Sequence, residues 1–148
     1  MSTILVVDDS PVERKLTSLL LRRRGYTIVT AADGEEGIQV ATEENPDLIV
    51  MDVIMPRKNG FQACRQIKST PGLAEIPVIL QSSKNSEADA FWAKQQGADT
   101  YLHKPINEAK LLKAVFSFLS QELLQRYEAA EQRWRRHKGH NHSDIEWH

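Results

Sequence analysis

The alternation of short apolar segments with amphipathic segments is the feature that most constrains how this chain can fold. Five runs rich in branched apolar residues predict strands: residues 3–8, 26–31, 47–51, 78–81 and 100–102. A segment with apolar residues three or four positions apart follows each run and predicts a helix. Strands that are apolar throughout and separated by helices are typical of a parallel sheet buried on both faces. The sequence therefore predicts an α/β fold.

Capping residues indicate where several helices begin and end. Ser10 is expected to cap the first helix, with Pro11 at its first position and Glu13 completing a capping box. Gly25 is expected to end that helix, and Asn107 to cap the last one. The first helix therefore begins directly after the acidic end of the first strand.

The last helix is expected to continue well beyond the sheet. Apolar residues recur along it at Leu112, Phe116, Leu119, Leu123, Tyr127, Ala130 and Trp134. We divide the chain into a domain over residues 1–121 and a helical extension with a flexible tail over residues 122–148, disordered from Gly139 to His148. The stripe from Leu119 to Trp134 exposes apolar area that a monomer cannot bury, which predicts self-association or pairing with a partner helix.

Polar residues follow four of the predicted strands at the point where each strand ends. Asp8 and Asp9 follow the first strand, Asp52 the third, Ser82 the fourth and Lys104 the fifth. In an open parallel sheet, ligands bind beyond the carboxyl ends of the strands. We therefore expect three carboxylates, a hydroxyl and an ammonium to converge on one pocket.

The chemistry of this pocket predicts a metal ion and a phosphate. Three carboxylates held close together repel one another unless a cation joins them, and oxygen ligands favour Mg²⁺. Lys104 adds a point charge suited to an oxyanion beside the metal. The plainer alternative is that Asp8 and Asp9 cap the first helix and Lys104 is a solvated surface residue. Because Ser10 already supplies that cap, the sequence favours a phosphate-handling site.

Composition narrows the functional classes. The 148 residues carry a formal net charge of −1, so attraction to nucleic acid or to an anionic membrane is not expected. No apolar run approaches the roughly 20 residues of a membrane helix, and the first residues enter a strand at once, leaving no room for a signal peptide. Cys64 is the single cysteine and is expected to be buried and inert. These features predict a cytoplasmic protein.

Together, the residues at the strand ends resemble the receiver domain of bacterial response regulators. The motifs that carry the resemblance are Asp8-Asp9, Asp52 followed by Met55-Pro56 and Gly60, a hydroxyl after the fourth strand, and Lys104-Pro105. The resemblance covers about residues 3 to 120. It implies a flavodoxin-like (βα)5 three-layer sandwich with the parallel strand order 2-1-3-4-5, here with an extended C-terminal helix.

The resemblance also implies how the acidic residues act. Asp52 would be the phosphoacceptor, which requires it to be ionised and aimed at phosphorus. Asp9, Asp52 and the main-chain carbonyl of Ile54 would bind Mg²⁺, and Asp8 would assist through water.

Three further residues receive roles by the same resemblance. Ser82, favoured over the adjacent Ser83, would hydrogen-bond the phosphoryl group, and Lys104 would form an ion pair with it. Tyr101 would be the aromatic switch residue. The Lys104-Pro105 peptide bond is expected to be cis.

The function implied is that of a single-domain response regulator in a two-component phosphorelay. Phosphate would come from a histidine kinase or a phosphotransfer domain, because the chain has no Gly-rich nucleotide loop. Phosphate on Asp52 would draw Ser82 inward, free space for Tyr101, and reshape the surface of the fourth helix, fifth strand and fifth helix, where a downstream protein would bind. The chain would catalyse only its own phosphoryl acceptance and hydrolysis, and would not otherwise be an enzyme.

A finer resemblance concerns the region after the fourth strand. Residues 81–84 and 91–98 are similar to stand-alone regulators of pilus-driven twitching motility or phototaxis. Phe91 and Trp92 are neighbours on one helix and cannot both face the core, so one is expected to face outward.

Other functions fit the sequence less well. One alternative is a Mg²⁺-dependent phosphatase with an aspartyl nucleophile, of the haloacid-dehalogenase type. Its chemistry requires a second acid two residues after the nucleophile, where this chain has Ile54. A DNA-binding regulator would need more than the 28 residues that follow Ser120. His137, His140 and His142 could bind metal, although a solvated tail is the simpler interpretation.

Overall fold

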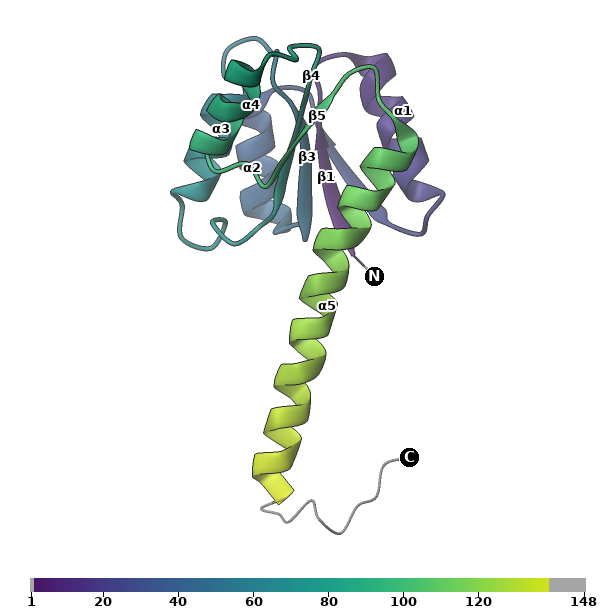
Figure 1. The fold of residues 1–148 in the computed structure, drawn as a ribbon, viewed down its shortest axis with the longest axis vertical. Helices are drawn as coiled ribbons and strands as arrows, with labels where there is room; N and C mark the ends of the chain where they lie inside the picture. The colour runs from purple at the N-terminus through teal and green to yellow at the C-terminus, as the bar shows by residue number, and fades with distance from the viewer. Residues whose placement is uncertain (1, 139–148) are drawn as a thin grey trace.

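The computed structural model describes residues 2–138, which form a five-stranded parallel sheet flanked by helices. The strands are β1 (Thr3–Val7), β2 (Thr27–Ala31), β3 (Leu48–Asp52), β4 (Val78–Ser82) and β5 (Thr100–His103). Their order across the sheet is β2-β1-β3-β4-β5, and all neighbouring strands are parallel. This confirms the predicted flavodoxin-like topology (Figure 1).

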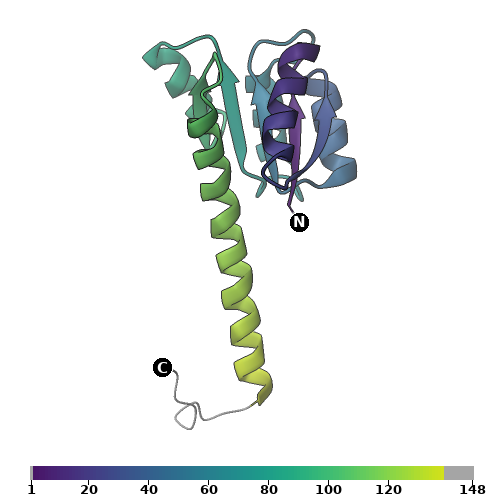
Figure 2. The ribbon, with the colours of Figure 1, turned by 90° about the vertical axis from the view of Figure 1, so that its right-hand side faces the viewer.

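Helices cover both faces of the sheet. They are α1 (Pro11–Arg22), α2 (Gly34–Glu44), α3 (Gly60–Lys68), α4 (Glu87–Gln95) and α5 (Glu108–Lys138). Helices α1 and α5 lie on one face, and α2, α3 and α4 lie on the other, which gives the predicted three layers (Figures 1 and 2).

Successive residues of the central strands point to opposite faces, so the sheet has two cores. In β3, Ile49 and Met51 pack with residues of α2, α3 and α4, whereas Leu48 and Val50 pack with residues of α1 and α5. All four are fully buried, and burying a side chain of this size contributes about 1.5–3 kcal/mol. Cys64 of α3 is also buried, and burial raises the pKa of its thiol to about 11, as expected for an inert cysteine.

Helix α5 extends far beyond the sheet (Figures 1 and 2). Its first half packs on the sheet through Leu111, Val115 and Leu119. Leu119 is only 3% exposed, so its predicted place in an exposed stripe is wrong, whereas Phe116 is 66% exposed. The helix passes through residues 121 and 122 without a break, and the division of the chain there stays a prediction. The predicted disorder from Gly139 onward concerns residues outside the described range.

Both aromatic side chains of α4 face outward. Phe91 is 63% exposed and Trp92 is 51% exposed, whereas only one of them was expected to be exposed. Ala93 is the α4 residue that is buried against the sheet, which turns both aromatic residues toward solvent. None of the helices in residues 2–138 combines the length and the apolar character needed to cross a bilayer.

Candidate functional site

The strand register brings four of the predicted site residues to one edge of the sheet. Asp8 and Lys104 directly follow β1 and β5, while Asp52 and Ser82 are the last residues of β3 and β4. Because neighbouring strands are parallel and in register, their carboxyl ends meet at this edge. The predicted convergence of these residues is therefore observed.

The ammonium of Lys104 lies among three carboxylates. Its Nζ is 2.7 Å from Glu13 Oε2, 3.1 Å from Asp8 Oδ2 and 3.4 Å from Asp52 Oδ2. The side chains of Lys104, Asp8 and Asp52 are each at most 10% exposed, so these charges interact in a poorly solvated environment. Lys104 is thus not a solvated surface residue, and the Lys104–Pro105 bond that follows it is cis, as predicted.

Glu13 is a member of this cluster that sequence reasoning missed. The sequence predicts a capping box between Glu13 and Ser10, but the Ser10 N–H donates instead to Asp8 Oδ1 at 3.0 Å. Ser10 still caps α1 by accepting the Glu13 N–H at 3.3 Å, while the Glu13 carboxylate accepts from Lys104. The available signal was its place in the first turn of α1, which begins shortly after Asp8, at the edge of the sheet where Lys104 follows β5.

Asp8 is held firmly by its neighbours. Its Oδ1 accepts the Ser10 N–H, and its carbonyl accepts a hydrogen bond from the Arg14 guanidinium at 2.7 Å. Its Oδ2 is therefore directed at Lys104.

Burial raises the pKa of Asp52 to about 6, although the charge of Lys104 acts to lower it. The charges of Asp8 and Asp9 raise this pKa further. For Lys104, burial acts to lower the pKa, but the hydrogen bond to Glu13 and the charges of Asp52 and Asp8 outweigh it, and the pKa is raised. At neutral pH, Asp52 is therefore a mostly ionised carboxylate beside a firmly charged ammonium.

Gly60 allows α3 to begin against the end of β3. A Cβ atom at this position would lie 2.3 Å from the Asp52 carbonyl oxygen and 2.8 Å from the Val53 Cα. The Gly60 N–H donates to the Val53 carbonyl at 2.8 Å. Only glycine fits this approach, which fixes the backbone that carries Asp52.

Ser82 and Tyr101 are linked through Lys84. Ser82 is fully buried, and its Oγ accepts the Lys84 N–H at 3.1 Å while its carbonyl accepts the Lys104 N–H at 2.8 Å. The Tyr101 hydroxyl donates to the Lys84 carbonyl at 2.5 Å. The adjacent Ser83 is exposed. The hydroxyl groups of Ser82 and Tyr101 therefore both bond to the backbone of Lys84, and the predicted switch roles of the two residues stay predictions.

Three carboxylates could hold a metal ion. Asp8, Glu13 and Asp52 each offer an oxygen, and these oxygens lie within 4.8 Å of one another. Oxygen donors of this kind suit Mg²⁺. Asp9 is exposed and is not in this group, and the Ile54 side chain is half exposed. The predicted contacts of Asp9 and the Ile54 carbonyl with an ion stay predictions.

Comparison with known proteins identifies the class that this fold and site define. Residues 4–116 match the response regulator receiver domain. The chain therefore belongs to that family and contains the receiver domain of a two-component response regulator.

Particular relatives are similar over most of the receiver domain. PilH of Pseudomonas aeruginosa is 42% identical over 120 residues, which cover 81% of this chain and 99% of PilH. The receiver domain of a P. aeruginosa sensor histidine kinase, solved with magnesium in its active-site cleft, has a TM-score of 0.75 and 28% identity, covering 80% of this chain and 98% of that one. CheY of Borrelia burgdorferi, in a complex with CheX, BeF3 and magnesium, has a TM-score of 0.74 and 30% identity. The match covers 80% of this chain and 89% of that one.

Proposed function

We propose that the chain accepts a phosphoryl group on Asp52 and uses this modification to switch a protein-binding surface. The observation that carries the proposal is the buried ammonium of Lys104 among Asp8, Glu13 and Asp52. Phosphoryl transfer requires mainly positioning and charge stabilisation. A carboxylate that is ionised at neutral pH, next to a fixed cation, meets both requirements.

The proposed transfer uses the residues of this edge directly. A carboxylate oxygen of Asp52 forms a bond to phosphorus while the bond from phosphorus to the donor's histidine nitrogen breaks. The nitrogen leaves with the electron pair and is then protonated. Lys104 stabilises the charge on the phosphoryl oxygens, and Ser82 donates a hydrogen bond to one of them. Later attack by water regenerates Asp52, so the chain acts on its own phosphate and is not otherwise an enzyme.

Mg²⁺ is the proposed cofactor. Asp8, Asp9, Asp52 and the Ile54 carbonyl would hold it, and Glu13 is placed to contribute an oxygen as well. When bound, Mg²⁺ neutralises charge shared by the acceptor carboxylate and the phosphoryl oxygens. The convergence of the acidic oxygens supports this proposal, as does the magnesium in the similar receiver domain.

Three protein partners are proposed. The phosphoryl donor is a histidine kinase or a phosphotransfer domain, and a downstream protein binds the face formed by α4, β5 and α5. Exposed Phe91 and Trp92 on α4 support this second site, and the bond from Tyr101 to the Lys84 carbonyl connects it with Ser82. A second copy of the chain, bound through the C-terminal part of α5, is the third partner.

We further propose that the chain acts in the cytoplasm, in type IV pilus motility or taxis. The similarity to PilH supports this pathway, as does the resemblance of residues 81–84 and 91–98 to regulators of twitching motility and phototaxis.

The test is phosphorylation of the purified chain by a small acyl phosphate in the presence of Mg²⁺, followed by intact-mass spectrometry. We expect one added phosphoryl group that is absent from Asp52→Asn. Asp33→Asn is the matched control, because Asp33 caps α2 by accepting the Glu36 N–H and asparagine can do the same. Equal labelling of wild type and Asp52→Asn would refute the assignment.

A further inference from the structure

The exposed flank of α5 carries a regular pattern that phosphoryl transfer does not use. The pattern, called here the α5 seam, consists of Phe116, Ser120, Leu123, Tyr127, Ala130 and Trp134. Successive positions are separated by four, three, four, three and four residues. This spacing is the a/d repeat of a two-stranded coiled coil, in which each helix presents a narrow apolar line to its partner.

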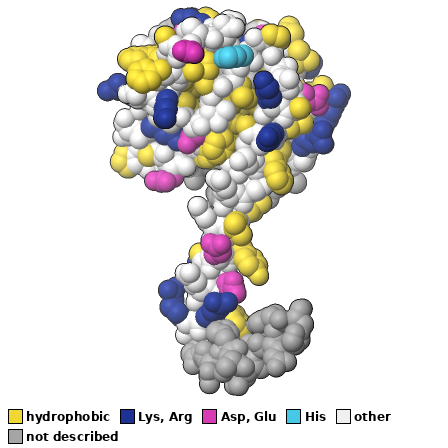
Figure 3. Space-filling view, viewed as in Figure 1, with side chains coloured by type: hydrophobic (Ala, Val, Ile, Leu, Met, Phe, Trp, Pro, Cys, Tyr) yellow, Lys and Arg dark blue, Asp and Glu magenta, His cyan; other side chains and the backbone are white. Residues whose placement is uncertain are grey.

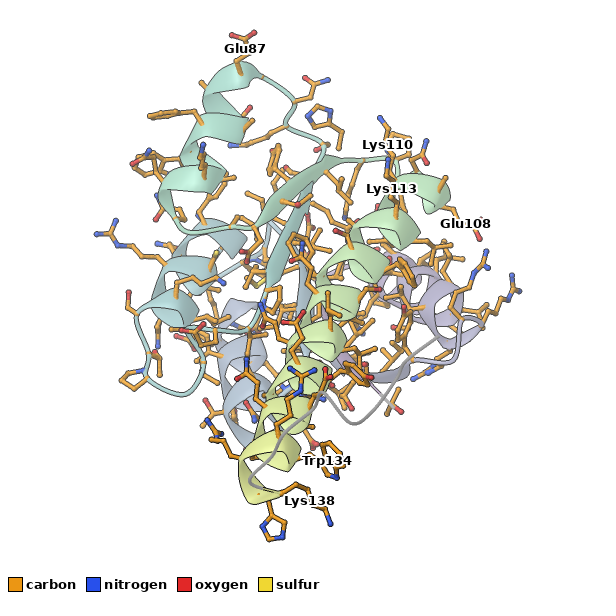
Figure 4. All side chains as sticks on the ribbon, turned by 60° about the horizontal axis from the view of Figure 1, so that its bottom comes forward. Glu87, Glu108, Lys110, Lys113, Trp134 and Lys138 are labelled. Carbon is orange, nitrogen blue, oxygen red and sulfur yellow. The ribbon has the colours of Figure 1, made fainter. Side chains whose placement is uncertain are left out.

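The α5 seam is open to solvent in a single copy of the chain. Phe116 is 66% exposed, Leu123 58%, Tyr127 67% and Trp134 45%. Hydrophobic side chains are visible along the projecting helix in Figure 3, and Figure 4 shows Trp134 near its far end. A line of exposed apolar side chains, interrupted here only by the half-buried Ser120, marks an interaction surface.

The α5 seam is also placed so that a second helix could reach it. It lies roughly a quarter turn around α5 from the face that Leu111, Val115 and Leu119 pack against the sheet. Its N-terminal end borders a hollow lined by Arg24, Tyr26, Leu112, Lys113 and Phe116. A partner helix could therefore run alongside the domain as well as along the projecting part of α5.

The projecting part of α5 has little of its own domain to pack against. The guanidinium of Arg126 is 3.5 Å from Asp47 at the base of the sheet, and the helix then continues to Lys138. Figures 1 and 2 both show this segment leaving the domain. An isolated helix of this length is only marginally stable in water, and most helices in proteins are stabilised by packing of an apolar face.

Charged residues beside the α5 seam indicate which partner helix would bind to it. In the a/d register above, Arg126 occupies a g position and Glu131 the e position five residues later. In a parallel dimer, a g residue meets the e residue five positions later on the other helix. Each copy carries both Arg126 and Glu131. A parallel dimer would therefore contain two such ion pairs, each from Arg126 of one copy to Glu131 of the other. In a single copy, Glu131 pairs with Arg135 at 2.6 Å and Arg126 pairs with Asp47 at 3.5 Å, so both residues would exchange partners on dimer formation.

We propose that two copies of this chain associate through the α5 seam as a parallel coiled coil, with both receiver domains at the same end. An antiparallel pair would bring g residues together, and Arg126 and Arg133 would then repel. The proposal rests on the self-association included in the proposed function and adds its contact residues and polarity, and it does not depend on phosphoryl acceptance at Asp52.

Sedimentation equilibrium of the full chain tests the association. We expect a concentration-dependent dimer for the wild type and a monomer for L123D/Y127D. The matched control is Q125D/Q132D, which places the same charges on the opposite side of α5 and should remain dimeric. Monomers at every concentration would overturn the proposal, as would a dimer unaffected by L123D/Y127D. Binding of a monomeric wild type to phosphatidylglycerol vesicles would assign the α5 seam to lipid instead.

Charge reversal tests the pairing of Arg126 with Glu131. R126E should weaken the dimer by about threefold to tenfold, because two attractive pairs become repulsive. R126E/E131R restores opposite charges and should recover most of the affinity. Failure of the double variant to recover would contradict the proposed register.

Disulfide formation tests the polarity. A130C should cross-link on mild oxidation, because position 130 meets its own copy in a parallel dimer and lies far from it in an antiparallel one. Q132C, on the opposite side of the helix, is the control and should not cross-link efficiently. A dimer without an A130C cross-link would overturn the parallel arrangement. Phosphorylation of Asp52 in the L123D/Y127D variant should match the wild type, which separates failure of this inference from failure of the proposed function.

Discussion

Lys104 Nζ lies closer to Glu13 Oε2, at 2.7 Å, than to Asp52 Oδ2, at 3.4 Å. The ammonium that is proposed to bind the phosphoryl group is thus shared with a carboxylate from a different helix. An incoming phosphoryl oxygen has to compete with Glu13 for this cation. Glu13 therefore limits how strongly Lys104 can bind a phosphoryl group at Asp52.

Glu13→Gln should lower the pKa of Asp52 below its present value of about 6, because Lys104 is then free to approach Asp52. It should also raise the rate of phosphorylation at saturating Mg²⁺ by up to about fivefold. A partly exposed ion pair is worth at most about 1 kcal/mol, which corresponds to that factor. NMR titration of the Asp52 carboxyl group and a phosphorylation time course measure the two effects. Glu44→Gln, which removes a carboxylate from the exposed end of α2, should change neither, and a higher Asp52 pKa in Glu13→Gln would contradict the argument.

The sheet and its functional edge could be predicted because they depend on short-range patterns. Apolar runs such as Leu48–Met51 mark buried strands, and parallel strands carry the residues that follow them to one edge. The convergence of Asp8, Asp52 and Lys104 could therefore be predicted from their positions directly after or at the ends of the strands.

The direction of individual side chains could not be predicted in the same way. Glu13 does not form the expected capping box because the Ser10 N–H donates to Asp8. That hydrogen bond depends on the three-dimensional turn after β1. The exposed stripe on α5 includes Phe116 and not the predicted Leu119. The reason is that packing against the sheet determines which side of the helix is buried. Local periodicity leaves such choices open, and tertiary packing decides them.

Asp52→Asn should stabilise the metal-free protein at neutral pH. The pKa of Asp52 rises from 3.8 to about 6 on folding, so the folded state binds this proton more tightly than the unfolded state. Stability therefore falls as pH rises from about 4 to about 6, and the loss reaches about 3 kcal/mol above that range. Urea unfolding of Asp52→Asn should show a gain approaching this value at pH 7.5 and little gain below pH 4.

The control for this pH dependence is Asp33→Asn, whose change in stability at neutral pH should have the opposite sign. The pKa of Asp33 is lowered by its hydrogen bonds to the Glu36 N–H and the Arg57 guanidinium. Asp33→Asn should therefore lose stability at neutral pH and recover toward the wild type as the pH falls through the lowered pKa. A gain for Asp52→Asn that did not vary with pH would show that burial of its charge is not the cause.

Lys104→Met should destabilise the metal-free protein at pH 7.5 by about 3 kcal/mol, because it leaves Asp8 and Asp52 as buried carboxylates without their cation. Thermal unfolding with and without Mg²⁺ measures this loss, and added Mg²⁺ or a pH near 5 should restore part of it. Lys110→Met removes an exposed lysine from the first turns of α5 (Figure 4) and should have little effect. Equal stability of Lys104→Met and wild type at pH 7.5 would mean that the cluster is not held together by this charge.

Ile54→Asn should shorten the lifetime of the Asp52 phosphate. The Ile54 side chain is half exposed two residues after Asp52, and it has no polar group that could orient an attacking water. An amide there could position that water, and one added hydrogen bond in the transition state is worth on the order of tenfold in rate. Decay of the phosphorylated protein, followed by mass spectrometry after removal of the donor, measures the lifetime. Ile54→Leu keeps the apolar character and should decay like the wild type. If the asparagine variant keeps the wild-type lifetime, the side chain at position 54 does not control hydrolysis.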